Sequence, residues 1–135
     1  MKRTLATFLV SMAVASFAWA QTKEEAAEAA VLEWLSYVDA GEYVTSWSAA
    51  AAAFKDQVSP QQWQSAASNA RKPLGELHTR RKIASRYTTS LPGVPDGEYV
   101  VVQFDAGFAN KAAGTETVTA VLENGVWRVT GYFVR

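Results

Sequence analysis

Residues 116–133, ETVTAVLENGVWRVTGYF, contain the pattern that decides the fold of this chain. Asn124-Gly125 is a strong two-residue hairpin turn, because both positions tolerate a positive φ. The turn pairs Glu123 with Val126 and sets the register of both strands. On one face the register predicts four pairs, Leu122–Trp127, Ala120–Val129, Val118–Gly131 and Glu116–Phe133. On the other face it predicts Val121–Arg128, Thr119–Thr130 and Thr117–Tyr132. One largely apolar and one mostly polar face indicate a half-buried antiparallel sheet.

Two further strands precede the hairpin. Residues 98–108 alternate between an apolar and a less apolar face, which predicts a strand. Residues 77–89 are rich in β-branched and aromatic residues, but Arg81 falls in phase with Leu77 and Ile83, which a β-bulge would explain. The turn-rich stretch 91–97 connects the two strands.

The first half of the chain has helical signals. Thr22 and Glu25 form a capping-box pattern before an apolar face that runs to Gly41. A second helix is predicted over 42–55, and Ser59-Pro60 opens a third. The prediction is a single α+β domain over residues 21–135. About three N-terminal helices pack on a curved antiparallel sheet of about four strands, in a cone-like roll.

Residues 1–20 have the pattern of a secretory signal peptide. Lys2 and Arg3 precede an uncharged apolar run, and Ala18-Trp19-Ala20 predicts cleavage after Ala20. The run is short for a membrane span, and no Cys follows it to carry a lipid anchor. We therefore expect export to the periplasm or the medium, without a membrane anchor.

Composition excludes several function classes. Removal of Lys2 and Arg3 leaves 11 basic against 13 acidic residues, which argues against a nucleic-acid partner. The chain has no Cys and one His, so thiol chemistry is excluded, a zinc site is disfavoured, and no cofactor is expected. Residues 24–42 are acidic and residues 71–86 are basic, so these stretches either face each other or form two surface poles. The basic stretch is interpreted as a solvated face, with binding of anionic polymers or lipid head groups as the alternative.

The order of several short motifs resembles a known family. Asp39 to Tyr43, Trp47 and Phe54 are similar to the helix-turn-helix opening of nuclear-transport-factor-2-like domains. More specifically, the chain resembles the bacterial domain-of-unknown-function family 4019. That resemblance is carried by Arg71, Pro73-Leu74-Gly75, Arg80 or Arg81, Leu91-Pro92-Gly93, Pro95 to Tyr99, Phe108, Glu116 to Thr119, Trp127 to Val129 and Gly131-Tyr132. It implies a small exported domain, with a cone-like fold by analogy with the larger superfamily, and no established activity.

Three carboxylates are candidates for a catalytic base: Asp39, Asp105 and Glu116. The alternative for Asp105 is a solvated position on the less apolar face of its strand. Glu116 falls on the apolar face of the hairpin, which predicts either a salt bridge with Arg135 at the sheet rim or an acid lining a pocket. Glu116→Gln separates the two, because a purely structural role would lower stability and leave ligand binding intact.

Aromatic and hydroxyl side chains supply the remaining candidates. Trp34, Trp47 and Trp63 lie on the apolar faces of the helices and are either core residues or a ligand cage. With Glu116 and Arg135 they form the candidate ligand site. The polar face of the hairpin is the candidate interface, formed by Thr117, Thr119, Val121, Arg128, Thr130 and Tyr132.

The leading hypothesis is a non-enzymatic exported domain that binds a small molecule or an envelope protein. One alternative is a cone-fold enzyme that uses a pocket carboxylate as general base. The other is a structural homodimer that pairs through the sheet face.

Overall fold

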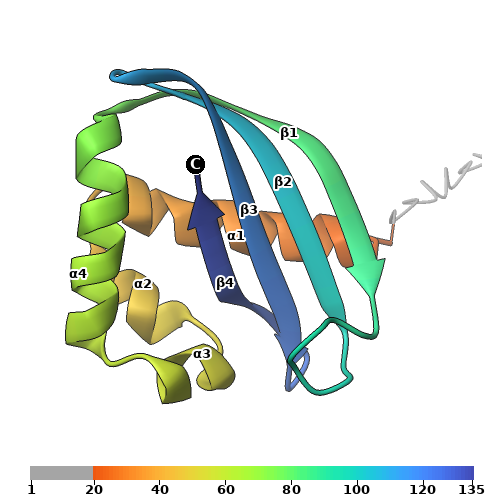
Figure 1. Cartoon of the computed structure of the whole chain (residues 1–135). Coiled ribbons are helices and arrows are strands. Elements are labelled where there is room, and N and C mark those ends of the chain that lie inside the picture. Colours follow the sequence, from red (N-terminus) through yellow and green to blue (C-terminus); the bar gives the residue numbers. More distant parts are fainter. Residues whose placement is uncertain (1–19) are drawn as a thin grey trace, which may run out of the picture.

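The computed structural model describes residues 20–135, so the expected signal peptide lies outside the described residues apart from Ala20. Four helices precede four strands (Figure 1). The helices are α1 (Lys23–Asp39), α2 (Tyr43–Ala49), α3 (Ala52–Gln57) and α4 (Pro60–Arg71), and a short 3-10 turn, η1 (Lys72–Leu74), follows them. The strands are β1 (Leu77–Thr88), β2 (Tyr99–Phe108), β3 (Lys111–Glu123) and β4 (Val126–Val134). This is the predicted α+β class. Within residues 20–135, no helix has both the length and the hydropathy needed to cross a membrane.

The sheet is an antiparallel meander in the order β1-β2-β3-β4. Helix α1 passes behind the strands and contacts all four of them (Figure 1). Its apolar face and the inward side chains of the sheet form one core, which includes Val31, Leu35, Val100, Val118 and Val129. The opposite side of the sheet is not covered by α1, and we call it the outer face. Its side chains include those of Val101, Gln103, Asp105, Thr115, Thr117, Thr119, Val121 and Phe133.

The predicted helix starts are confirmed. Thr22 and Glu25 form a capping box on α1, and Ser59 and Gln62 form one on α4. Each box satisfies backbone N–H groups that a helix start leaves without a partner. Gly41 has φ +73° just after α1, as expected for the residue that ends a helix.

The second helix is two short helices instead of the one predicted over 42–55. The break lies at Ala50 and Ala51, which are fully buried and extended. The N–H of Ala51 donates to the carbonyl of Val129 at 2.8 Å, so this segment lies against β4. A local preference for helix in the alanine run is therefore overridden by packing against the sheet.

The hairpin turn is as predicted, but the register predicted for the residues farthest from the turn is wrong. Asn124 and Gly125 both have positive φ, and the four pairs nearest the turn, out to Ala120–Val129, are confirmed. Beyond them Thr119 pairs with Gly131, because Thr130 is an extra residue in β4. This β-bulge shifts the rest of β4 by one residue. Glu116 therefore pairs with Val134, Thr117 with Phe133 and Val118 with Tyr132.

The bulge suspected in the first strand is present. The β1–β2 register shifts between Leu77 and Thr79 and again between Lys82 and Ala84. As a result Arg80 lies opposite Ala106 on the inner face, and Ile83 is exposed. Irregular pairing thus places a charged side chain inside and an apolar one outside.

Candidate functional site

Five polar residues from five elements meet on the inner face of the sheet. Asp39 ends α1, Arg71 ends α4, and Arg80, Glu116 and Tyr132 come from β1, β3 and β4. They are joined by hydrogen bonds and ion pairs, and we call them the ion cluster. The cluster contains two of the three predicted acids. Arg71 and Arg80 were absent from the predicted site, although both carry the family resemblance.

Arg80 is the centre of the ion cluster. Its Nε donates to Glu116 Oε1 at 2.7 Å, and its Nη2 donates to Glu116 Oε2 at 3.1 Å. Its Nη1 and Nη2 also donate to Asp39 Oδ2 and Oδ1, at 2.8 and 2.9 Å. One planar guanidinium therefore binds two carboxylates, each through two bonds, a geometry that Lys cannot reproduce.

Arg71 closes the cluster from the helix side. Its Nη2 donates to Asp39 Oδ1 at 2.9 Å, and its guanidinium lies over the ring of Phe108 at 4.9 Å. The side chain is only 6% exposed, and its Nε has no partner among the described residues. Two arginines thus balance the two carboxylates, as buried charges require.

Tyr132 links the ion cluster to the aromatic core. Its hydroxyl donates to Glu116 Oε2 at 2.6 Å, and its ring lies 5.5 Å from that of Trp34 and 6.4 Å from that of Trp63. The bulge at Thr130 turns this side chain inward, so Tyr132 is not a member of the polar interface predicted for it. Gly131 inside a strand is the sequence signal that indicates such a bulge.

The electrostatics favour the charged forms of Asp39 and Arg80 and the neutral form of Tyr132. Burial alone would raise the pKa of Asp39, but the hydrogen bonds and charges of Arg80 and Arg71 outweigh it and hold that pKa below its usual value. Burial lowers the pKa of Arg80, but Asp39 and Glu116 reverse that effect and raise it. Burial, and then the charge of Glu116, raise the pKa of the Tyr132 hydroxyl far above its usual value.

Each of the three candidate bases is engaged in an ion pair. Glu116 is fully buried and bound to Arg80 and Tyr132, so it does not form the predicted rim salt bridge with Arg135. The backbone of Arg135 pairs with Thr115 at the exposed end of the chain. Asp105 lies on the outer face as expected, in an exposed pair with Arg81 at 3.1 Å.

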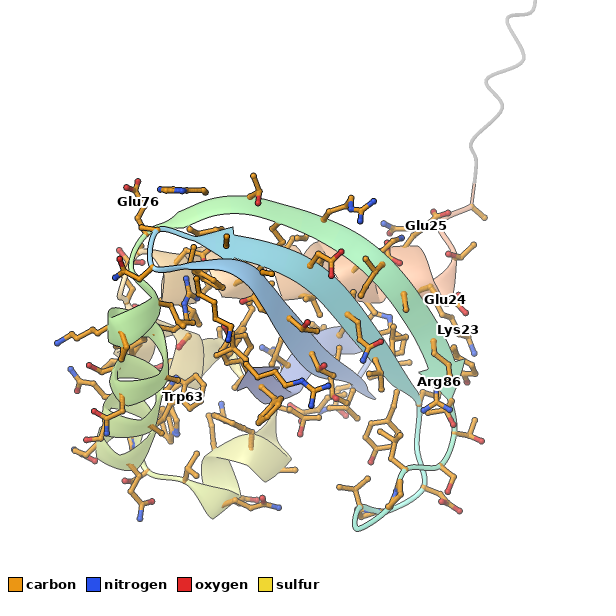
Figure 2. All side chains as sticks on the ribbon, turned by 45° about the horizontal axis from the view of Figure 1, so that its top comes forward. Lys23, Glu24, Glu25, Trp63, Glu76 and Arg86 are labelled. Atoms are coloured by element: carbon orange, nitrogen blue, oxygen red, sulfur yellow. The ribbon has the colours of Figure 1, made fainter. Side chains whose placement is uncertain are left out.

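The three tryptophans are satisfied within the domain. Trp34 Nε1 donates to the carbonyl of Ser46 at 2.8 Å, and Trp63 Nε1 donates to the Ser46 hydroxyl at 2.9 Å. Trp47 Nε1 donates to the carbonyl of Val58 at 2.8 Å and is half-buried. Figure 2 shows Trp63 on the side of α4 that faces the rest of the domain. These side chains fill the space between helices and sheet, as core residues do.

The acidic and basic stretches face each other. Asp39 pairs with Arg71 and Arg80, and Glu28 pairs with Lys82 at 2.8 Å. With Arg81 on Asp105, most of the basic stretch is neutralised by carboxylates of the domain itself. This leaves little net positive charge there for an anionic polymer or lipid surface.

Several hollows open on the outer face. One of about 440 Å³ lies over Thr79, Asp105, Gly107 and Thr115. A second of about 290 Å³ is lined by Ala84, Arg86, Val101 and Gln103. A third of about 230 Å³ lies between α3, β4 and the segment before β2. The candidate interface residues Thr117, Thr119, Val121 and Arg128 are half-buried on this same side.

One more hollow, of about 320 Å³, lies on the helix side, beside Asp39 and Arg71. Among residues 20–135, no group of three His, Asp or Glu side chains is arranged to hold a metal ion.

Comparison with protein families gives a match to the family described as "Protein of unknown function (DUF4019)", over residues 30–132. The chain belongs to this family. The DUF4019 match includes all five residues of the ion cluster. Of the two arginines that the sequence resemblance left open, Arg80 lies in the ion cluster, whereas the side chain of Arg81 is 78% exposed. Comparison with curated proteins gives no significant match.

Proposed function

We propose that this DUF4019 chain is an exported, non-enzymatic binding domain. The signal-peptide pattern of residues 1–20 supports export to the periplasm or the medium. A sheet with helices on one side also agrees with a relationship to nuclear-transport-factor-2-like domains. The proposed binding surface is the outer face, for a small ligand or an envelope protein.

The proposal rests on the difference between the two sides of the sheet in exposed hollows and free polar groups. On the inner side, aromatic rings fill the space between helices and sheet, and the ion cluster holds Asp39 and Glu116. The outer face has two hollows along β1 and β2, where Val101, Gln103 and Thr115 lie beside the charged residues Arg81, Arg86 and Asp105. Concave, partly apolar surface is where ligands and partners bind.

The enzyme alternative has weaker support. A general base works best when its pKa is raised toward the working pH. The pKa of Asp39 is lowered, and Glu116 is held by Arg80 and Tyr132. We therefore do not assign either carboxylate a catalytic role.

The test is native mass spectrometry of the mature chain purified from its own exported compartment. The outer-face variant is Gln103→Lys with Thr117→Glu, because these residues are cross-strand partners and opposite charges suit the sheet. The matched control places the same two charges on exposed positions of α4, as Gln61→Glu with Ser65→Lys. We expect the wild type and the control to retain a bound species that the outer-face variant loses. Equal retention by all three proteins, or retention by none, contradicts the proposal.

One observation favours a second candidate, the structural homodimer. Phe133 lies on the outer face and is 58% exposed, so its ring offers apolar area that a partner can cover. A second copy packed against this face would bury it in a symmetric contact. Sedimentation of the mature chain then gives a dimer that Phe133→Ser converts to a monomer. A wild-type monomer at high concentration rules this candidate out.

A further inference from the structure

The 230 Å³ hollow lies at one end of the outer face. Its walls are α3, β4 and the connector before β2, and we call it the connector hollow. Its lining residues are Ala53, Phe54, Gln57, Leu91, Pro92, Val94, Tyr99, Thr119, Thr130 and Gly131. The turn-rich connector, residues 91–97, therefore contributes Leu91, Pro92 and Val94 to one wall of the hollow.

The connector wall is held in place by the backbone. Tyr99 Oη donates to the carbonyl of Pro95 at 2.6 Å, and the N–H of Gly97 donates to the carbonyl of Thr89 at 3.1 Å. Gly93 supplies a left-handed residue at φ +79°, and two prolines restrict the remainder. These features keep the wall apart from β4 instead of letting it fold onto the sheet.

The opposite wall is shaped by the β4 bulge. Thr130 is the extra residue of the bulge, and Gly131 beside it has no side chain. Bulges commonly redirect side chains beside functional sites. Here the bulge brings the Thr130 hydroxyl and a bare backbone to the hollow, opposite Phe54 of α3.

The lining chemistry is apolar with a few neutral polar groups. Most lining side chains are hydrocarbon or aromatic, and none of them is charged. The hydroxyls of Thr119 and Thr130 and the amide of Gln57 make no side-chain hydrogen bond with the rest of residues 20–135. They are therefore free to bond a polar group on a ligand. An ionised ligand would lose water here without meeting a counter-charge.

We propose that the connector hollow binds a small neutral aromatic molecule that carries a hydroxyl group. A cavity of about 150 Å³ lined by apolar side chains is enough for benzene. The connector hollow is larger and has hydroxyl and amide groups at its edge, so it suits a substituted ring. This inference rests on the proposed function, and it names the ligand class for one end of the outer face.

The probe is p-cresol, followed by amide chemical shifts of the isotope-labelled mature chain. We expect saturable shifts at Gly93 and Gly131, with a Kd of about 1 mM or tighter. Benzoate, which is an anion of similar size, is expected to bind at least about tenfold more weakly because its charge has no partner in the lining.

The decisive variant is Gly131→Val. A Cβ at Gly131 would lie 3.8 Å from Thr119 Cβ, an ordinary contact, so the first carbon of the new side chain fits without a clash beside the hollow. The matched control is Ser65→Val, which places a valine at an exposed position of α4 away from the hollow. We expect p-cresol affinity to fall at least about tenfold in Gly131→Val and to stay unchanged in the control.

Several outcomes overturn the inference, and they are separable from failure of the proposed function. Unsaturable shifts in the wild type, equal binding of benzoate, or full affinity in Gly131→Val each overturn it. An unchanged urea midpoint for Gly131→Val shows that its result is not a folding defect. If p-cresol does not bind while the Gln103→Lys, Thr117→Glu variant still loses its retained species, only the ligand class is wrong. If p-cresol binds while that variant retains everything, the wider outer-face function is wrong and the hollow stands.

Discussion

Arg80 binds Glu116 across an intervening strand. The two residues belong to β1 and β3, yet Nε lies 2.7 Å from Oε1 and Nη2 lies 3.1 Å from Oε2. Ala106, the residue of β2 opposite Arg80, has a side chain of one carbon that leaves room for this reach. The pair therefore ties an edge strand to the middle of the sheet through side chains as well as through the backbone.

Glu116→Gln is expected to lower the free energy of unfolding by about 2–4 kcal/mol. The substitution keeps the shape but leaves the buried guanidinium of Arg80 with one carboxylate fewer, and breaking a buried ion pair from one side is costly. Urea denaturation measures the change. Asp105→Asn is the control, because that acid is half-exposed in a surface pair, and its effect should stay within about 0.5 kcal/mol. Equal effects of the two substitutions would contradict the cluster.

Arg80→Lys is expected to destabilise the fold by about 3 kcal/mol although it keeps the charge. An ammonium group cannot bind Glu116 and Asp39 through paired bonds, so buried carboxylate oxygens lose their partners. The neighbouring Arg81→Lys is the matched control at an exposed site and should have almost no effect. Thermal unfolding of both variants gives the comparison, and a tolerated Arg80→Lys counts against the paired geometry.

Stability is expected to fall in acid through Asp39. Its pKa is lower in the folded chain than the ordinary value of about 3.9 in the unfolded chain, so unfolding binds a proton. The stabilisation is therefore present above about pH 4 and is lost as the pH falls through the folded pKa.

Urea midpoints measured from pH 7 to pH 3 test this dependence. Glu98, whose pKa is lowered by Lys23 and Tyr87, acts in the same direction. The difference between the wild type and Asp39→Asn isolates the share of Asp39. Identical pH profiles for the two proteins would refute the assignment.

Ser46→Ala is expected to cost about 1–3 kcal/mol. The Ser46 hydroxyl accepts the indole N–H of Trp63 and donates to the carbonyl of Tyr43 at 2.7 Å, so its loss leaves a buried donor without a partner. Ser48→Ala, in the same helix but exposed, is the control. Urea denaturation of both variants checks the difference, together with the near-ultraviolet circular dichroism of the tryptophans. A Ser46→Ala protein as stable as the control would mean that this bond contributes nothing.

Local sequence rules predict most of the fold and little of the site. The capping signals at Thr22 and Ser59 and the Asn124-Gly125 turn act within a few residues, so their outcomes are readable from the sequence. The break at Ala51 depends on a hydrogen bond to Val129, almost eighty positions away. No local pattern contains that information.

The sequence did not predict the ion cluster, because it too depends on features that local patterns do not fix. Arg80 and Tyr132 both face inward because a β-bulge lies before each of them. The β1 register shifts between Leu77 and Thr79, and the β4 register shifts at Thr130. Strict alternation places each on the wrong side, since a shift by one residue exchanges the two faces of a strand. Gly131 in β4 and the out-of-phase arginines in β1 were the available signals. Neither signal identifies which residue of the strand is the extra residue of the bulge.

The two faces of the sheet make separate sets of contacts because successive residues of each strand point to opposite sides. Thr117 lies between Glu116 and Val118 in the chain, yet it shares neither the ion cluster nor the core with them. The outer face can therefore change its chemistry through evolution while the interior stays constant. Members of this family can share one scaffold and still differ in the chemistry of this face.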